Sequence, residues 1–217
     1  MVSITLTGAD ERTPLDELIG LADSGAEIGI LLSLTNKGSR YPSLEWIGKA
    51  AELLQGRASI HVCGYAGRTA LFQGNLNWLL GRVRRFQVNG CVLIGELERL
   101  CEANPDSTVI TQHKAYNLGL LACKAKNHAI LVDDSGGTGT SPKRWIRPKT
   151  EKCVGFAGGL GADNLADELA RIGPLLGDGW IDMESKLRTD DWFDAEKARA
   201  CLAVYNEWTG SQFHGVS

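Results

Sequence analysis

Short apolar runs alternate along the chain with longer stretches in which apolar and polar positions follow the spacing of an amphipathic helix. The runs have the length of strands, and residues 26–32 are nearly all apolar, as in a parallel strand that is covered on both faces. They comprise residues 3–7, 26–32, 58–63, 85–88, 108–112, 129–133, 153–157 and 179–183. The helical stretches comprise residues 14–24, 44–54, 69–83, 95–101, 118–125, 163–172 and 194–207. This regular alternation predicts parallel strands joined by crossover helices.

Local signals mark several helix ends. Thr13 is the expected N-cap of the first helix, with Pro14 in its first turn and Asp16 completing a signal like a capping box. Ser43 is the expected N-cap of the helix over residues 44–54. Residues 134–150 are rich in Gly, Pro, Lys and Arg, which predicts that this connection is mostly loop.

Eight strands at this spacing predict an α/β protein that closes into a single (β/α)₈ TIM barrel. The chain has 217 residues, which fits one barrel, because such barrels need at least about 200 residues. An open, doubly wound sheet is the alternative, but the Gly-x-Gly-x-x-Gly fingerprint of dinucleotide binding is absent after the first strand. We expect the barrel to occupy residues 1–208 and residues 209–217 to form a flexible tail.

Composition narrows the classes of function. The net charge of −3 offers no basic field for nucleic acid. No apolar run is long enough to span a bilayer, and residues 1–12 lack the features of a signal peptide. The six cysteines form no Cys-x-x-Cys pair, which favours reduced thiols and a cytoplasmic location. No histidine spacing indicates a metal site, no cofactor is expected, and the sequence does not indicate an oligomeric state.

In a TIM barrel, the chemistry lies on the loops that follow the strands, and the loops after strands seven and eight commonly hold a phosphate. Here those strands end in Gly158-Gly159 and in Glu184-Ser185. Paired glycines let backbone N–H groups approach an anion closely, and Ser185 can add a hydroxyl donor. We therefore expect a phosphorylated small-molecule substrate at this corner, with the Glu184 carboxylate pointing away from the phosphate.

Other strand ends carry candidate catalytic groups. Asp133 ends the sixth strand and is suited to general acid or base chemistry, and the glycines after it, Gly137 among them, can close a loop over a ligand. Arg40 follows the second strand and can bind a carboxylate or phosphate with two hydrogen bonds. Cys63 and His113 also end strands, and each is a candidate for proton transfer.

Several of these segments, in order along the chain, resemble phosphoribosylanthranilate isomerase, the barrel enzyme of the tryptophan pathway. The segment Ser39-Arg40-Tyr41-Pro42-Ser43 is similar to the one whose arginine meets the anthranilate carboxylate. Phe86-Gln87-Val88-Asn89-Gly90 is similar to the family's Val-Gln-Leu-His-Gly, with Asn89 in place of histidine. Further resemblance lies in Leu131-Val132-Asp133 with the following Gly136-Gly137-Thr138-Gly139, in Ala157-Gly158-Gly159-Leu160 with Asn164, and in Asp182-Met183-Glu184-Ser185 with Asp194.

The resemblance implies an Amadori rearrangement, in which an aminoaldose phosphate becomes an aminoketose phosphate. It assigns the general acid to Asp133 and substrate binding to Arg40, Gly137, Gly158, Gly159, Glu184 and Ser185. The family's base is a cysteine in the first strand, and Thr7 stands at its place. A threonine hydroxyl is too weak a base without an activating partner.

Substitutes for the missing base are therefore needed, and the candidates are Cys63, Asp10 and His113. Two other functions stay open. One is a lyase or aldolase acting on another phosphorylated small molecule, for which Lys114 is the nearest amine. The other is a non-catalytic protein that binds a phosphorylated ligand.

Overall fold

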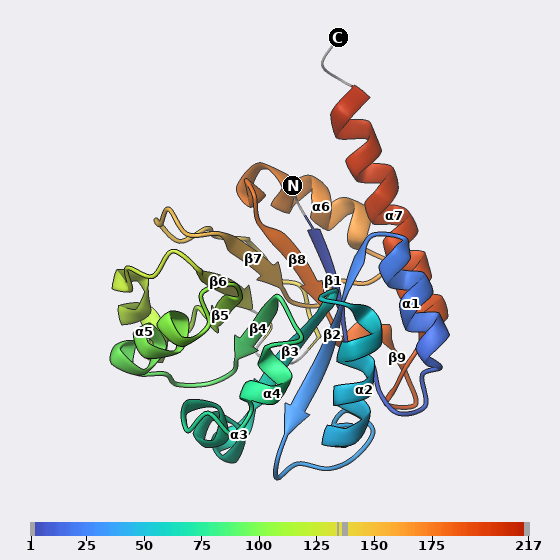
Figure 1. Cartoon of the computed structure of the whole chain (residues 1–217). Coiled ribbons are helices and arrows are strands. Elements are labelled where there is room, and N and C mark those ends of the chain that lie inside the picture. Colours follow the sequence, from blue (N-terminus) through green and yellow to red (C-terminus); the bar gives the residue numbers. More distant parts are fainter. Residues whose placement is uncertain (1–2, 134, 136–138, 215–217) are drawn as a thin grey trace.

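The eight predicted strands form a closed parallel barrel in a computed structural model of the chain, which describes residues 3–133, 135 and 139–214 (Figure 1). Neighbouring strands pair in chain order, and β1 closes the barrel by pairing in parallel with β8. The prediction of a single (β/α)₈ barrel is confirmed, and the open sheet is excluded. The strands are β1 (Ser3–Thr7), β2 (Ala26–Ser33), β3 (Ala58–Cys63), β4 (Arg85–Val88), β5 (Thr108–Gln112), β6 (His128–Asp133), β7 (Val154–Ala157) and β8 (Trp180–Met183).

Helices cover the outside of the barrel (Figure 1). The α-helices are α1 (Leu15–Asp23), α2 (Leu44–Leu54), α3 (Gly64–Phe72), α4 (Asn77–Leu80), α5 (Ile94–Ala103), α6 (Leu165–Leu176) and α7 (Ala195–His214), and the 3₁₀ helices are η1 (Ala115–Ala122) and η2 (Ser185–Leu187). The prediction of one continuous helix over residues 69–83 was wrong. The helix begins earlier, as α3, and is interrupted before α4 at Gly74, whose φ of +78° lies in the left-handed region that glycine favours.

Two helix ends differ from their predictions. Thr13 does not cap α1, because its hydroxyl donates to the Asp10 carboxylate and the cap position belongs to Pro14. Helix α7 continues to His214, beyond the predicted end at residue 207. Ser43 is confirmed as the cap of α2, since its hydroxyl accepts a hydrogen bond from the Trp46 backbone N–H at 3.3 Å. The division into a barrel of residues 1–208 and a tail stays a prediction.

The connection from β6 to β7 is a loop, as predicted, and no helix occurs in it among residues 139–153, the part that the structure describes. Trp145 fills the space on this side of the barrel. Its ring packs edge-on against Phe156 with 5.8 Å between centroids, and its indole N–H donates to Glu168 of α6 at 2.7 Å.

A small hairpin follows η2 and was not predicted. Its strands are β9 (Arg188–Thr189) and β10 (Trp192–Phe193), joined by Asp190 and Asp191. Both aspartates have positive φ, 50° and 64°, as the primed turns of two-residue hairpins require. Arg188 lies buried under this hairpin, 3.6 Å from the Asp10 carboxylate, and donates to the Gly8 carbonyl at 2.9 Å.

The barrel interior is polar on one side and apolar on the other. On the polar side, Arg85 forms a 3.0 Å ion pair with Glu27, and the Thr5 hydroxyl donates to the same carboxylate. The apolar side consists of Ile110, Ala129, Leu131 and Trp180, with Ala157 against them. Two glycines make room for large or polar neighbours: a Cβ at Gly29 would lie 2.0 Å from the Thr7 hydroxyl oxygen, and one at Gly155 would lie 2.2 Å from the Trp180 indole.

Candidate active site

A pocket opens at the ends of the strands where barrel enzymes carry their chemistry, and we call it the C-terminal pocket. It brings together six of the residues that the sequence predicted as site residues: Thr7, Asp133, Gly158, Gly159, Glu184 and Ser185. Cys63 and Arg40 lie next to it, because Cys63 accepts a hydrogen bond from Asn89, which lines the pocket, and Arg40 is paired with Glu184. Gly137 lies outside the described residues.

Three loops converge at the predicted phosphate corner. A Cβ at Gly139 would lie 3.1 Å from the Ser185 side chain, and one at Gly159 would lie 2.4 Å from the Ser141 backbone nitrogen. Asn164 fastens this corner, donating to the Gly159 carbonyl and accepting from the Gly161 N–H, both at 2.9 Å. Gly158, Gly159 and the exposed Ser185 therefore line the same part of the pocket.

Thr7 belongs to a buried polar cluster that the sequence did not predict. Its hydroxyl donates to Asp182 Oδ1 at 2.8 Å, and His61 Nε2 lies 3.7 Å from Asp182 Oδ2. Burial raises the pKa of Asp182 to about 8, although the Thr7 hydrogen bond and Arg85 act in the opposite direction. Burial also lowers the pKa of His61 to about 3, with Arg85 adding to the effect.

The signal for this cluster was present in the sequence. Polar residues at every second position of a buried strand, such as Ser59, His61 and Cys63, indicate the face that points into a barrel. Gln87 on β4 and Asn89 directly after it continue the same alternation. The Gln87 side-chain amide donates a hydrogen bond to Asn89 Oδ1 at 2.7 Å. All of these alternating residues except Ser59 and Cys63 line the C-terminal pocket.

Asp133, at the end of β6, lines the same pocket in a different environment. Its Oδ1 accepts hydrogen bonds from the Ser135 backbone N–H at 3.2 Å and from the Ser135 hydroxyl at 2.7 Å. Lys114 Nζ lies 3.9 Å from Asp133 Oδ2 and also donates to the Asp133 carbonyl oxygen. Asp133 is thus surrounded by donors and a positive charge.

The three proposed substitutes for the family's cysteine base are placed differently. Burial raises the pKa of the Cys63 thiol to about 11, which disfavours a thiolate near neutral pH, and the Asn89 hydrogen bond offsets this only in part. Asp10 is fully buried and accepts hydrogen bonds from the Phe193 and Arg12 backbone N–H groups. His113 does not line the C-terminal pocket.

Arg40 is already engaged by two carboxylates of the protein. Its guanidinium lies 3.1 Å from Glu184 and 2.8 Å from Asp191, so it joins the loop after β2 to the segment after β8. This pairing keeps the Glu184 carboxylate on Arg40, although burial still raises the pKa of Glu184. The C-terminal pocket encloses about 90 Å³, well below the roughly 300–1,000 Å³ of typical ligand sites.

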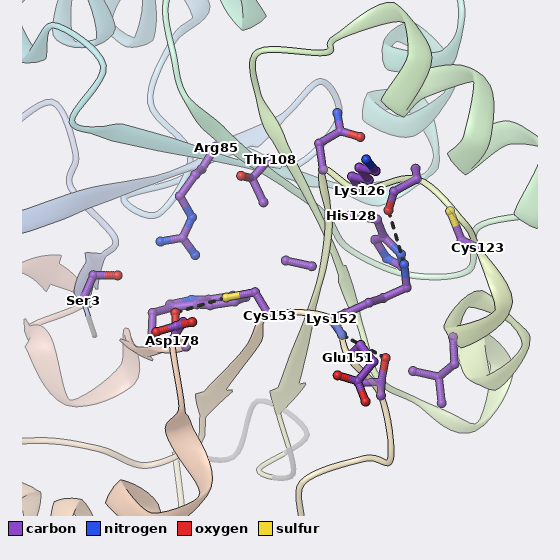
Figure 2. A pocket seen from close by; sticks show the side chains of 17 residues that line it. Ser3, Arg85, Thr108, Cys123, Lys126, His128, Glu151, Lys152, Cys153 and Asp178 are labelled. Atoms are coloured by element: carbon purple, nitrogen blue, oxygen red, sulfur yellow. Dashed lines mark hydrogen bonds between the residues drawn. The ribbon is translucent and has the colours of Figure 1, made fainter. Parts of the chain in front are cut away.

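A wider cavity of about 680 Å³ lies at the opposite end of the barrel, where the strands begin (Figure 2). Most of the polar groups around it have protein partners. Lys152 donates to the Ala125 carbonyl, Cys153 to the Asp178 carbonyl, and Arg85 pairs with Glu27 and lies 4.2 Å from the centre of the Trp180 ring. In TIM barrels the end where the strands begin contributes to stability, and the catalytic residues lie at the other end.

Neither a metal-ligating cluster nor a membrane-spanning helix occurs in the described part of the chain. It contains no group of three or more His, Cys, Asp or Glu side chains that could hold a metal ion. Its helices include none with the length and apolar character needed to cross a membrane. The six cysteines are all free thiols.

No protein-family model matches the sequence, and neither does any curated protein. Solved structures do match the fold. Phosphoribosyl anthranilate isomerase from Thermus thermophilus superposes with a TM-score of 0.66 at 19% identity, covering 95% of this chain and 100% of that one. TrpF from Jonesia denitrificans gives 0.70 at 16% identity, covering 96% and 98%.

A third match is phosphoribosyl anthranilate isomerase in complex with reduced 1-(o-carboxyphenylamino)-1-deoxyribulose 5-phosphate, with a TM-score of 0.64 at 16% identity over 95% of this chain. Identities this low establish the fold alone. From β1 to α7, the chain therefore has the barrel fold of the phosphoribosylanthranilate isomerases, as the resemblance in its strand ends implied.

Proposed function

We propose that the chain is a divergent isomerase of the phosphoribosylanthranilate isomerase type, which converts a phosphorylated aminoaldose into the aminoketose. The observation that carries this proposal is that Gly159, Ser185 and two carboxyl groups, Asp133 and Asp182, line one pocket of this fold, at the corner where barrels commonly hold a phosphate. A phosphate held at Gly159 and Ser185 would place the sugar carbons over the pocket. The cytoplasmic location and the place in tryptophan biosynthesis belong to the same proposal.

The surroundings of Arg40 favour a substrate that carries a carboxylate. It already binds the carboxylates of Glu184 and Asp191, so its position and donors suit this group. A substrate carboxylate would exchange with the exposed Asp191, which is the more accessible of the two.

The direct test is turnover of phosphoribosylanthranilate by the purified protein, with substrate and product separated by chromatography. We expect Asp133→Asn to reduce kcat by roughly 10²–10⁴-fold, the usual contribution of a positioned acid or base. Asp106→Asn, which removes an exposed aspartate outside the C-terminal pocket, is the matched control. Undiminished turnover in Asp133→Asn would remove Asp133 from the mechanism.

A binding assay tests the phosphate corner separately. A phosphorylated sugar that binds the folded protein raises its melting temperature. Ser185→Asp places a negative charge at the corner, and we expect it to abolish that rise, whereas Asn75→Asp, in the exposed loop between α3 and α4, should keep it. An unchanged rise in Ser185→Asp would contradict the site, and binding without turnover in the unsubstituted protein would favour a non-catalytic ligand-binding role.

The structure gives less support to an aldolase that uses Lys114. The ammonium of Lys114 is taken up by the carbonyl and carboxylate of Asp133, as in an ion pair. A Schiff base would require that amine to be neutral and free to attack a carbonyl.

A further inference from the structure

Three carboxyl groups line the C-terminal pocket. Glu184 is paired with Arg40, and the other two, Asp182 and Asp133, lie in different surroundings. Only 7% of the Asp182 side chain is exposed, on β8, and 18% of the Asp133 side chain, on β6. When two titratable groups share a site and their environments differ in this way, one is suited to donate a proton and the other to accept it.

The surroundings of Asp182 favour a bound proton. Thr7 from β1 and His61 from β3 are its polar neighbours. The charged groups that act on it are Arg85 from β4, Glu184 from β8 and Glu27 from β2, of which only Arg85 favours ionisation. With the pKa of Asp182 near 8 and that of His61 near 3, the pair carries one proton at neutral pH.

Hydrogen-bond donors and a cation surround Asp133. Ser135 donates twice to its Oδ1, and the Lys114 ammonium lies 3.9 Å from its Oδ2. The charge of Glu184 couples to Asp133, and Glu184 is itself paired with Arg40. Hydrogen-bond donors and a nearby cation both stabilise a carboxylate.

We infer that, given the isomerase function proposed above, Asp182 is the general acid and Asp133 the general base, the reverse of the role that the resemblance assigns to Asp133. His61, 3.7 Å from Asp182, and Lys114, 3.9 Å from Asp133, are positioning residues for these two groups. This arrangement also removes the need for a cysteine base at Thr7, whose hydroxyl instead orients the Asp182 carboxyl group.

The proton balance of the rearrangement closes with these two groups. Asp182 gives its proton to the ring oxygen as the bond between that oxygen and C1′ breaks, which leaves a C1′=N iminium. Asp133 takes the proton from C2′, and the electron pair of that C–H bond forms the C1′=C2′ bond of an enol amine. In the final step the Asp133 proton goes to C1′, the enol hydroxyl returns a proton to Asp182, and C2′ becomes the ketone carbon.

Lys114→Met distinguishes this assignment from its reverse. Removing the adjacent positive charge favours the protonated form of Asp133. If Asp133 is the base, the acidic limb of the kcat/KM profile moves to higher pH, and activity at a fixed pH on that limb falls. If Asp133 is the acid, the basic limb moves upward instead, and activity above neutral pH rises. Lys114→Arg keeps the charge and should keep the original profile.

The second measurement needs no substrate. Carbon-13 NMR of labelled aspartate, assigned with Asp182→Asn and Asp133→Asn, should show the Asp182 carboxyl group losing its proton near pH 8, after Asp133 has lost its own. Asp182 ionised at pH 6 or Asp133 protonated at pH 7 overturns the assignment, whether or not the protein turns over phosphoribosylanthranilate. Absence of turnover with the expected titrations would count against the proposed function alone.

Discussion

Thr7 stands where the resemblance places a cysteine, and the structure explains how the position is used here. Its hydroxyl holds Asp182, and its side chain fits only because Gly29 opposite has no Cβ. The consequence is a buried carboxyl–imidazole pair, Asp182 and His61, whose titration is coupled to folding. At the residue scale, the protonation of this pair depends on the burial of its two side chains.

This pair predicts how stability varies with pH. In the unfolded chain the two pKa values are about 3.9 and 6.5, whereas in the folded chain they are about 8 for Asp182 and about 3 for His61. Between about pH 4 and 6.5 both states hold one proton on the pair, so it does not change the free energy of unfolding. Between about pH 6.5 and 8 only the folded state holds it, so stability falls by about 1.4 kcal/mol per pH unit.

Urea unfolding of the unsubstituted protein and of Asp182→Asn checks this. We expect the decline above about pH 6.5 to disappear in the variant. The same slope in both proteins would show that another group is responsible.

At the scale of elements, the hairpin of β9 and β10 binds the side chain of Arg40. Asp191 sits in its turn and holds the Arg40 guanidinium, with the Ser39 hydroxyl as a further donor. The hairpin itself is anchored by the buried Arg188 and Asp10. A flexible arginine is thereby tied to a rigid support.

Releasing that tie should improve binding of a carboxylate substrate. Asp191→Asn keeps a residue that tolerates positive φ but loses the charge, so we expect KM for phosphoribosylanthranilate to fall a few-fold. Asp190→Asn makes the same change one residue earlier in the turn and is the control. A raised KM in Asp191→Asn would mean that Asp191 positions Arg40 for binding instead of competing with the substrate.

At the scale of the whole molecule, much of the fold was predictable and the site was predictable in part. Strand order and closure follow from eight buried apolar runs alternating with helices, and the site loops follow from the rule that barrels react at strand ends. The pairing of Thr7 with Asp182 was not predictable, because 175 residues separate them. They meet only because β1 closes against β8, and the sequence gives no register for that closure.

Packing inside the closed barrel gives a prediction at this scale. A Cβ at Gly155 would lie 2.2 Å from the Trp180 indole, so Gly155→Ala must displace a large buried ring and should cost about 1–3 kcal/mol of stability. Gly20→Ala, on the exposed face of α1 where nothing lies within 4 Å of the new atom, should instead stabilise the protein by about 0.5–1 kcal/mol. Denaturant unfolding measures both, and a neutral Gly155→Ala would show that the barrel centre is loosely packed.

The loop from β6 to β7 has a consequence for engineering. In its described part a single indole, Trp145, takes the place that a helix fills elsewhere around the barrel, and exposed residues such as Lys149 and Glu151 follow it. Foreign sequence grafted between those two residues would join the outer wall where no helical packing has to be broken. Such a graft must keep Trp145 and also Arg147, which donates to the Leu175 and Leu176 carbonyls of α6.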